Sequence, residues 1–341
     1  MGDKVSPIRP RCPEHGGWVV SPSFDLLFIA NVAWPLLLLP GMSGRSETVV
    51  DFWQVYFLTL PHRWITLILV ALDPDRRGRR GLLLAAIATV VFLVVVGVWL
   101  GTSSFTCLAV VDYIWNAWHF ASQHSGVLRI YSRKVGGGWA PLERHGLRFF
   151  VTYTILRTAT WTTGWLDDSP SSDWCLRVVD GAALAVPALL IVPALARFTQ
   201  HCLGRTMYLV SLCGLYTGLL LSLSYGWAPG VITMTTASSM FHAVEYMAIV
   251  TFYARRRRAI GSAGAFRRLA GVWLSFLAVY AVMLGAIGVW LDGKSSPIFQ
   301  LWQGVNLWAA MVHYAFDGVI WKLRQPETAR ALGAETTVSA A

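Results

Sequence analysis

Four long apolar stretches of the sequence contain ionisable and amide side chains that ordinary apolar helices lack. The earliest is the motif LPHR at 60–63, and the next is DYIWNAWHFASQH at 112–124. Two later stretches contain FHAVE at 241–245 and HYAFD at 313–317. Inside a lipid bilayer such side chains are costly and usually functional. The candidates for chemistry are therefore His62, Arg63, Asp112, Asn116, His119, Gln123, His124, His242, Glu245, His313 and Asp317.

Four of these histidines lie at similar heights above the first basic residue of the basic loop or tail that follows each apolar run, which is Arg76, Arg129, Arg255 or Lys322. The separation is 14 residues for His62, 10 for His119, 13 for His242 and 9 for His313. At 1.5 Å per helical residue this is ~14–21 Å, which is near the middle of a hydrocarbon core ~30 Å thick. We therefore expect four imidazoles from four helices to lie in one layer and to converge on one point.

The stretch around His119 has one polar face, because residues three, four or seven apart share a side of a helix. We expect three members of this face to support metal ligands by hydrogen bonding: Asp112, Asn116 and Gln123. His124 lies about 140° around the helix from His119 and cannot easily share one ion with it. It would serve a second metal, face another cavity, or contact only Arg129 and the membrane interface.

Carboxylates follow two of the histidines on the same helix face. Glu245 comes three residues after His242, and Asp317 comes four residues after His313. Each could ligate a metal, accept a hydrogen bond from the N–H of a metal-bound imidazole, or relay protons. Arg63 could neutralise a carboxylate or bind an anionic headgroup. We expect Glu245, Asp317 and Arg63 to take part in catalysis.

A single histidine in such a helix is more often satisfied by a hydrogen bond to a neighbouring helix. Four histidines at one depth, two of which have a carboxylate on the same helix face, favour a metal or redox site. Imidazole and carboxylate ligands without thiolate favour iron or zinc, and copper is an alternative. We expect one or two non-haem iron ions, with ligands drawn from His62, His119, His124, His242, His313, Glu245 and Asp317.

The composition is that of a membrane protein. Hydrophobic residues make up 55% of the 341 residues, and charged residues only 13%, against about 25% in soluble domains. The net charge of +10 would suggest a nucleic-acid partner in a soluble protein. Here the arginines fall in short clusters between apolar runs, so we expect a membrane lipid partner and no nucleic acid.

Ten apolar runs are long enough to cross a bilayer as helices. The loops after even-numbered runs are strongly basic, and the loops after odd-numbered runs are not. Because Lys and Arg are retained on the cytoplasmic side, we expect an all-α bundle of about ten spans with both termini cytoplasmic. We expect tails at 1–17 and 324–341, a transmembrane domain at 18–323, and a bacterial inner-membrane location. The runs are 18–39, 52–72, 82–100, 105–131, 147–165, 178–194, 207–227, 231–253, 269–291 and 298–323.

The order of the short motifs resembles the bacterial Brp/Blh family of membrane β-carotene 15,15′-dioxygenases. The matching motifs are LPH at 60–62, HF at 119–120, FH at 241–242, and His313 with Asp317 four residues later. The resemblance implies that His62, His119, His242 and His313 hold iron and that O₂ cleaves a carotenoid. The chain departs from the family pattern in Arg63, in Glu245 where a second late histidine is typical, and in its larger number of spans.

Three functional classes fit these residues. The first is a membrane oxygenase or oxidoreductase that uses O₂ on a lipid-soluble substrate such as an isoprenoid, a carotenoid or a fatty acyl chain. The second is a transporter with a metal or proton site at the midplane, because Pro61 could open the helix before His62. The third is an electron-transfer protein with haem b held by paired histidines.

Overall fold

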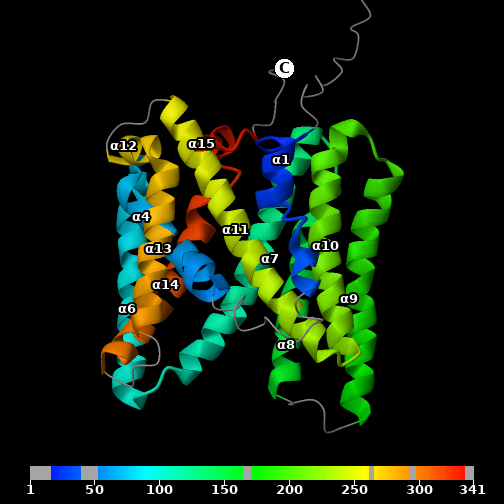
Figure 1. The fold of residues 1–341 in the computed structure, drawn as a ribbon, viewed down its shortest axis with the longest axis horizontal. Helices are drawn as coiled ribbons and strands as arrows, with labels where there is room; N and C mark the ends of the chain where they lie inside the picture. Colours follow the sequence, from blue (N-terminus) through cyan, green and yellow to red (C-terminus); the bar gives the residue numbers. More distant parts are fainter. Residues whose placement is uncertain (1–16, 40–52, 164–169, 261–264, 292–296, 335–341) are drawn as a thin grey trace, which may run out of the picture.

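The computed structural model describes residues 17–39, 53–163, 170–260, 265–291 and 297–334. Every regular element in these ranges is a helix, so the predicted all-α class is confirmed (Figure 1). The longer helices are α4 (Leu60–Leu72), α6 (Gly81–Thr102), α7 (Thr106–Val135), α8 (Leu147–Thr163), α9 (Pro170–Ala196), α10 (Leu203–Ser224), α11 (Ala228–Ile260), α13 (Trp273–Leu291) and α14 (Pro297–Ile320). Shorter elements are α1 (Pro22–Phe24), η1 (Asp25–Ile29), η2 (Trp34–Leu37), η3 (Gln54–Thr59), η5 (Leu142–Gly146), α12 (Ala265–Gly271) and α15 (Pro326–Ala331).

Five helical segments are long and apolar enough to cross a membrane. Large apolar side chains on their outer faces, such as Leu82, Leu93 and Trp290, are exposed. A lipid environment accounts for this surface, because soluble monomers rarely expose wide apolar patches. The chain is therefore an integral membrane protein. The five segments are Gln54–Leu72, Gly81–Thr102, Trp174–Ala196, Gln200–Ser224 and Trp273–Leu291.

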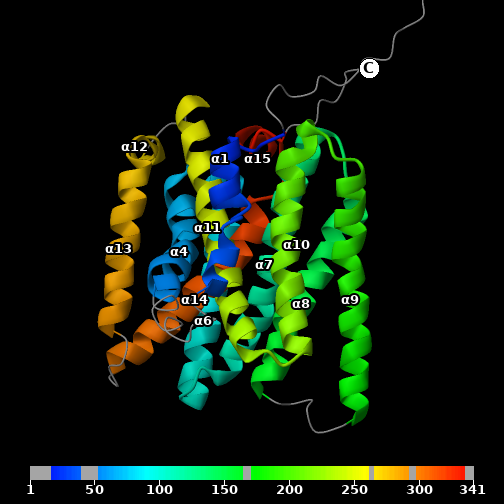
Figure 2. The ribbon, with the colours of Figure 1, turned by 45° about the vertical axis from the view of Figure 1, so that its right-hand side comes forward.

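The helices form two groups with the polar helices between them. Helix α14 packs on α4 and α6, while α8, α9 and α10 pack on one another. Helices α7 and α11 contact both groups and run obliquely between them, as Figure 1 and the turned view in Figure 2 show. Helices α7 and α11 thus join the two groups, while the first half of α7 keeps exposed apolar side chains such as Val110 and Trp118.

The first expected span is not one continuous helix. It consists of α1, η1 and η2, and Asn31 between the last two has a φ of +44°. The buried Asp25 carboxylate accepts hydrogen bonds from the backbone N–H groups of Val19 (2.6 Å) and Val20 (2.9 Å). The Tyr131 hydroxyl on α7 also donates to Asp25 (2.8 Å). The buried carboxylate thus binds the backbone just before α1 and joins this segment to α7.

The π-helical turn η3 leads directly into α4 and sets the start of that helix. Pro61 lacks an N–H and cannot continue the regular hydrogen-bond pattern, and π turns are frequent at functional sites. Gly285 on α13 lies so close to η3 that a Cβ there would be 2.5 Å from a ring atom of Phe57. The Tyr280 hydroxyl donates to the Pro61 carbonyl at 2.8 Å. Helix α13 therefore fixes the position of His62.

The C-terminal segment begins as part of the bundle. In α15 and just after it, Ala331 and Leu332 are buried, and the Thr328 hydroxyl donates to the Ile320 carbonyl at 3.3 Å. The predicted tail at 324–341 is thus packed as far as Ala334, which is also buried. The rest of that tail, and residues 1–16 of the N-terminal one, lie outside the described residues.

A buried ion network fixes the basic end of α7. Glu143 in η5 is completely buried and accepts from Arg129 (2.7 Å), Arg205 (2.6 Å) and the Ser132 hydroxyl (2.9 Å). Gly138 is needed beside it, because a Cβ there would lie 1.9 Å from a carboxylate oxygen of Glu143. The network joins α7, η5 and α10 at one point.

Replacing the central carboxylate should destabilise the bundle. In Glu143→Ala, buried Arg205 loses its partner, and breaking a buried pair in this way typically costs about 3–5 kcal/mol. Thermal or denaturant unfolding in detergent would measure the loss. Arg144→Ala changes the neighbouring exposed side chain and should alter stability by no more than about 0.5 kcal/mol. Equal stability of the two variants would contradict the structural role of Glu143.

Candidate metal centre

Four imidazole rings meet between the two groups of helices. His62 comes from α4, His119 from α7, His242 from α11 and His313 from α14. The ring centroids are 5.0 Å apart for His62–His242, 5.0 Å for His242–His119, 4.7 Å for His119–His313 and 5.1 Å for His313–His62. The contacts close a cycle of four rings, so the expected convergence is present.

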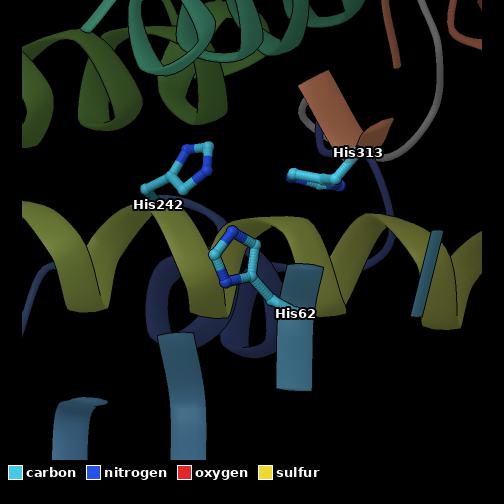
Figure 3. A group of neighbouring side chains, drawn as sticks. All are labelled: His62, His242 and His313. Atoms are coloured by element: carbon cyan, nitrogen blue, oxygen red, sulfur yellow. The ribbon is translucent and has the colours of Figure 1, made fainter. Parts of the chain in front are cut away.

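The spacing of the rings is that of ligands around one ion. With metal–nitrogen bonds of about 2.1 Å, adjacent ring centroids around one ion lie about 4.5–5.2 Å apart, from square-planar to tetrahedral angles. The observed separations fall in this range. In addition, His62, His242 and His313 each present a ring nitrogen, and these three atoms lie within 4.8 Å of one another (Figure 3). We call these three residues the three-histidine group.

The ring nitrogens that face this space have no protein partner. Both nitrogens of His62, both of His242, Nε2 of His119 and Nε2 of His313 are buried without a hydrogen bond. Leaving a buried polar atom unpaired costs about 1–3 kcal/mol, so a cluster of six such atoms needs compensation. A bound cation takes one nitrogen from each ring, so it would compensate four of the six atoms, and the donor set fits iron, zinc or copper.

The orientation of His313 is fixed from behind by Thr66. The Thr66 hydroxyl lies 2.7 Å from Nδ1 of His313 and also contacts the Tyr246 hydroxyl. Tyr246 in turn donates to Asp317 at 2.9 Å. Because the Thr66 proton has Tyr246 and Asp317 as acceptors, its oxygen is free to accept from the Nδ1–H of His313. That tautomer directs the Nε2 lone pair of His313 into the cluster.

Asp317 lies at the edge of the cluster. Its Oδ2 is 3.9 Å from Nε2 of His119 and 3.9 Å from Nδ1 of His313. These three residues form a second group of possible ligands, which shares His313 with the three-histidine group. Its other oxygen accepts from Tyr246 and, at 3.2 Å, from the Trp321 indole. One neutral imidazole binds one ion, so the two groups represent alternative positions for a single metal.

Glu245 and His124 form a second buried network beside the cluster, with the His124 ring 6.0 Å from that of His242. Nδ1 of His124 is 3.0 Å from a Glu245 oxygen, and the Tyr216 hydroxyl is 3.3 Å from its Nε2. The Tyr208 hydroxyl donates to the other Glu245 oxygen at 2.5 Å. Both nitrogens of His124 thus have protein partners, unlike those of the four clustered rings. His124 and Glu245 bind each other and do not join the three-histidine group.

The residues expected to support the ligands have different positions. Gln123 donates to the His242 carbonyl (3.0 Å) and to Glu245 (2.6 Å), so it connects the network to the cluster. Asp112 and Arg63 are half-buried and interact electrostatically next to the rings. Asn116 is half-buried on α7, and within the described residues its side chain makes no hydrogen bond to any of the four rings.

Sequence reasoning did not assign roles to the hydroxyl groups that hold the site. The spacing of four residues places Thr66 on the helix face of His62, but not its bond to His313, and Tyr246 directly follows Glu245. Tyr208 and Tyr216 lie on α10, where the sequence has no histidine or carboxylate. Their positions next to His124 depend on how α10 packs against α7.

Removing only the Thr66 hydroxyl should weaken metal binding. In Thr66→Val the Nδ1–H of His313 loses its acceptor, and loss of such a supporting partner typically lowers metal affinity about 10–100-fold. Competition with a chromogenic chelator would measure the affinity, and Thr66→Ser should retain it. Thr206→Val is a matched control, because the Thr206 hydroxyl is buried on α10 without a partner. Equal affinities in Thr66→Val and Thr206→Val would contradict this role.

No protein-family model, curated protein or solved structure matches this chain. The interpretation of the site therefore depends on the chemistry and geometry of its own residues.

Proposed function

We propose that the protein is a membrane-embedded non-haem iron oxygenase or oxidoreductase that uses O₂ on a lipid-soluble substrate. The observation that carries the proposal is the cycle of four buried imidazoles with six unpartnered nitrogens. Bound iron would bind and activate O₂ and would act as a Lewis acid toward the substrate. The resemblance to membrane carotene dioxygenases points to the same four histidines.

The spacing of the rings favours a mononuclear non-haem site over haem. A porphyrin between two axial histidines needs a wide flat space, whereas each ring here has two other rings with centroids only 4.7–5.1 Å away. Phe120 stacks on His242 with a centroid distance of 3.7 Å and closes one side. Copper or zinc would fit the same nitrogens, so the identity of the metal needs direct analysis.

The protein side chains would orient the ligands and exclude water. Thr66 sets the His313 tautomer, and Tyr246 and Trp321 hold Asp317 close to His119 without blocking it. The Asp317 carboxylate is thus in position to accept a proton at the edge of the site. The surrounding apolar helices would admit an isoprenoid, carotenoid or fatty acyl chain from the bilayer.

A transporter is the second candidate, and the irregular backbone before His62 favours it. The π turn η3 and Pro61 interrupt the helix within the apolar segment Gln54–Leu72. Transporters often place broken helices at their midplane ion sites. Metal that copurifies without O₂-dependent turnover, but moves across liposome membranes, would support this function instead.

We further propose that ten segments cross a bacterial inner membrane with the basic loops and both termini in the cytoplasm. Each of the ten apolar runs overlaps a helical segment. The first run is broken into short pieces, and the second and ninth each combine two elements, η3 with α4 and α12 with α13. Two native cysteines lie near opposite ends of the bundle, because Cys175 is near the start of α9 and Cys202 precedes α10.

The orientation predicts how these cysteines react. In variants that keep only one cysteine, a membrane-impermeant maleimide should label Cys175 in intact spheroplasts. Cys202 should react only after the membrane is permeabilised, because it follows a cytoplasmic basic loop. If Cys202 were labelled in intact spheroplasts and Cys175 only after permeabilisation, the topology would be the reverse of the proposed one. Equal labelling of both cysteines in intact spheroplasts would require a different number of spans.

Metal analysis tests the proposed function directly. We expect about one non-haem iron per chain in protein purified in mild detergent, and little haem. His62→Ala, His119→Ala, His242→Ala and His313→Ala should each lose most of the metal, because each removes a ligand that the others cannot replace. O₂ consumption with isoprenoid and acyl substrates should fall in parallel.

His145→Ala is the matched control, since His145 is exposed on η5 and should keep the wild-type metal content. The absence of metal from freshly prepared, folded wild-type protein would contradict the oxygenase proposal. A Soret band that disappears in the four variants would assign the site to haem instead.

A further inference from the structure

A succession of aromatic rings leads from the histidine cluster to α12. The centroid of the Tyr246 ring lies 5.1 Å from that of His313, and the Trp321 centroid lies 6.4 Å from that of Tyr246. Tyr253 follows at 5.5 Å from Trp321, and Phe266 follows at 6.1 Å from Tyr253. Separations of about 4.5–7 Å are those of aromatic rings in contact. We call Tyr246, Trp321, Tyr253 and Phe266 the aromatic chain.

Polar contacts and burial fix the rings of the aromatic chain. The Trp321 indole donates to the Tyr246 hydroxyl at 3.3 Å. The Tyr253 hydroxyl donates to the buried Asp73 carboxylate, whose other oxygen lies 3.6 Å from a guanidinium nitrogen of Arg257. Tyr253 and Phe266 are completely enclosed. The gaps between successive rings are therefore set by the fold.

The end of the aromatic chain at Phe266 lies next to a strongly basic surface. Arg267 and Arg268 directly follow Phe266 on α12 and are exposed, as is Arg255 on the adjoining end of α11. We call these three arginines the α12 basic surface. The segment 255–268 contains six arginines and no acidic residue. Figure 1 shows α12 at the same end of the bundle as α15.

The rings on the other side of the cluster lead away from this end. The Tyr314 ring lies 4.8 Å from that of His119, and the Trp115 ring lies 5.7 Å from that of Tyr314. Trp115 belongs to the first half of α7, whereas the basic side chains of that helix are in its second half. Retention of arginine on the cytoplasmic side explains why loops are basic, but it does not explain why a ring succession ends beside one of them.

We propose that an acidic one-electron carrier protein docks on the α12 basic surface and that the aromatic chain conducts its electron to an ion bound at the histidine cluster. The carrier is oxidised by one electron and the bound ion is reduced by one, and no bond forms or breaks. Opposite charges accelerate the docking of two proteins. The rings divide the distance from the surface to His313 into short gaps.

This inference rests on the proposed function, because it assigns an external source of electrons to the same site. It also narrows the class of reaction. A reaction that inserts one atom of O₂ into a substrate and releases the other as water consumes two electrons and two protons. Those electrons must come from another molecule, and the α12 basic surface is where they would enter.

A light-triggered measurement tests the aromatic chain without enzyme turnover. A ruthenium polypyridine complex would be attached to Ala265→Cys, at the exposed start of α12, in full-length iron-loaded protein whose native cysteines are replaced. After a flash with a reductive quencher and without O₂, the decay of the reduced complex gives the rate of electron transfer to the iron. Trp321→Leu should slow this transfer several-fold, and Trp321→Phe should retain most of the rate because it keeps a ring.

Trp115→Leu is the matched control for Trp321→Leu. Each tryptophan lies next to a tyrosine whose ring contacts a clustered histidine, but Trp115 is on the side away from α12. Trp115→Leu should therefore keep the wild-type rate. Equal rates in the two leucine variants would overturn conduction through the aromatic chain.

Binding of a defined acidic carrier tests the α12 basic surface. A plant-type ferredoxin should bind the protein in phosphatidylcholine nanodiscs, and the affinity should fall as salt is added, because salt screens exposed charges. Arg267→Glu combined with Arg268→Glu should abolish most of the binding. Arg144→Glu combined with Arg197→Glu changes the charge equally at exposed positions near α8 and α9 and should retain it. Equal loss in both double variants would overturn docking on α12.

The two proposals can fail separately. Metal content and O₂ consumption would be measured on the same preparations. Iron-dependent turnover with a rate of electron transfer that is unchanged in Trp321→Leu would contradict only the aromatic chain. Transfer that depends on Trp321 and reaches bound iron, without O₂ consumption on any lipid substrate, would contradict only the oxygenase.

Discussion

Unpaired imidazole nitrogens in the interior of the bundle are the constraint on which the rest of the structure depends. Six ring nitrogens of four clustered histidines are buried without a hydrogen bond, and each would be more stable in water. The surrounding elements resist their separation. Helix α13 fixes the start of α4 through Gly285, and Glu143 fixes the basic end of α7. The fold thus keeps together groups that would individually favour hydration.

The two carboxylates near the cluster are held in opposite ways. Glu245 is enclosed by His124, Tyr208 and Gln123. Both of its oxygens bind these side chains, and neither is directed to the three-histidine group. Asp317 uses one oxygen for Tyr246 and Trp321 and keeps the other within 4 Å of the cluster. The difference arises because Glu245 faces α10, where tyrosines are available, whereas Asp317 faces the histidines.

Hydrophobic runs and residue spacing were sufficient to predict the helical class and the convergence of His62, His119, His242 and His313. Depth along a helix is readable from sequence, because the rise per residue is constant. The partners of Glu245 were not predictable, since they require the rotation of α11 relative to α10. The interruption of the first expected span was not predictable either, because Asn31 and Trp34 at the break donate to carbonyls of Phe241 and Ser211 on distant helices. The number of spans and their orientation remain predictions.

The neutrality of the clustered ligands has a consequence for electron transfer. Imidazoles contribute no negative charge, and the Asp317 carboxylate stands just outside the three-histidine group while Arg63 adds a positive charge nearby. An ion bound in this apolar interior would therefore keep nearly its full charge. Burial and ligand charge help to set the redox potential of a metal, so an apolar site of neutral imidazoles would favour the less charged state of a bound ion.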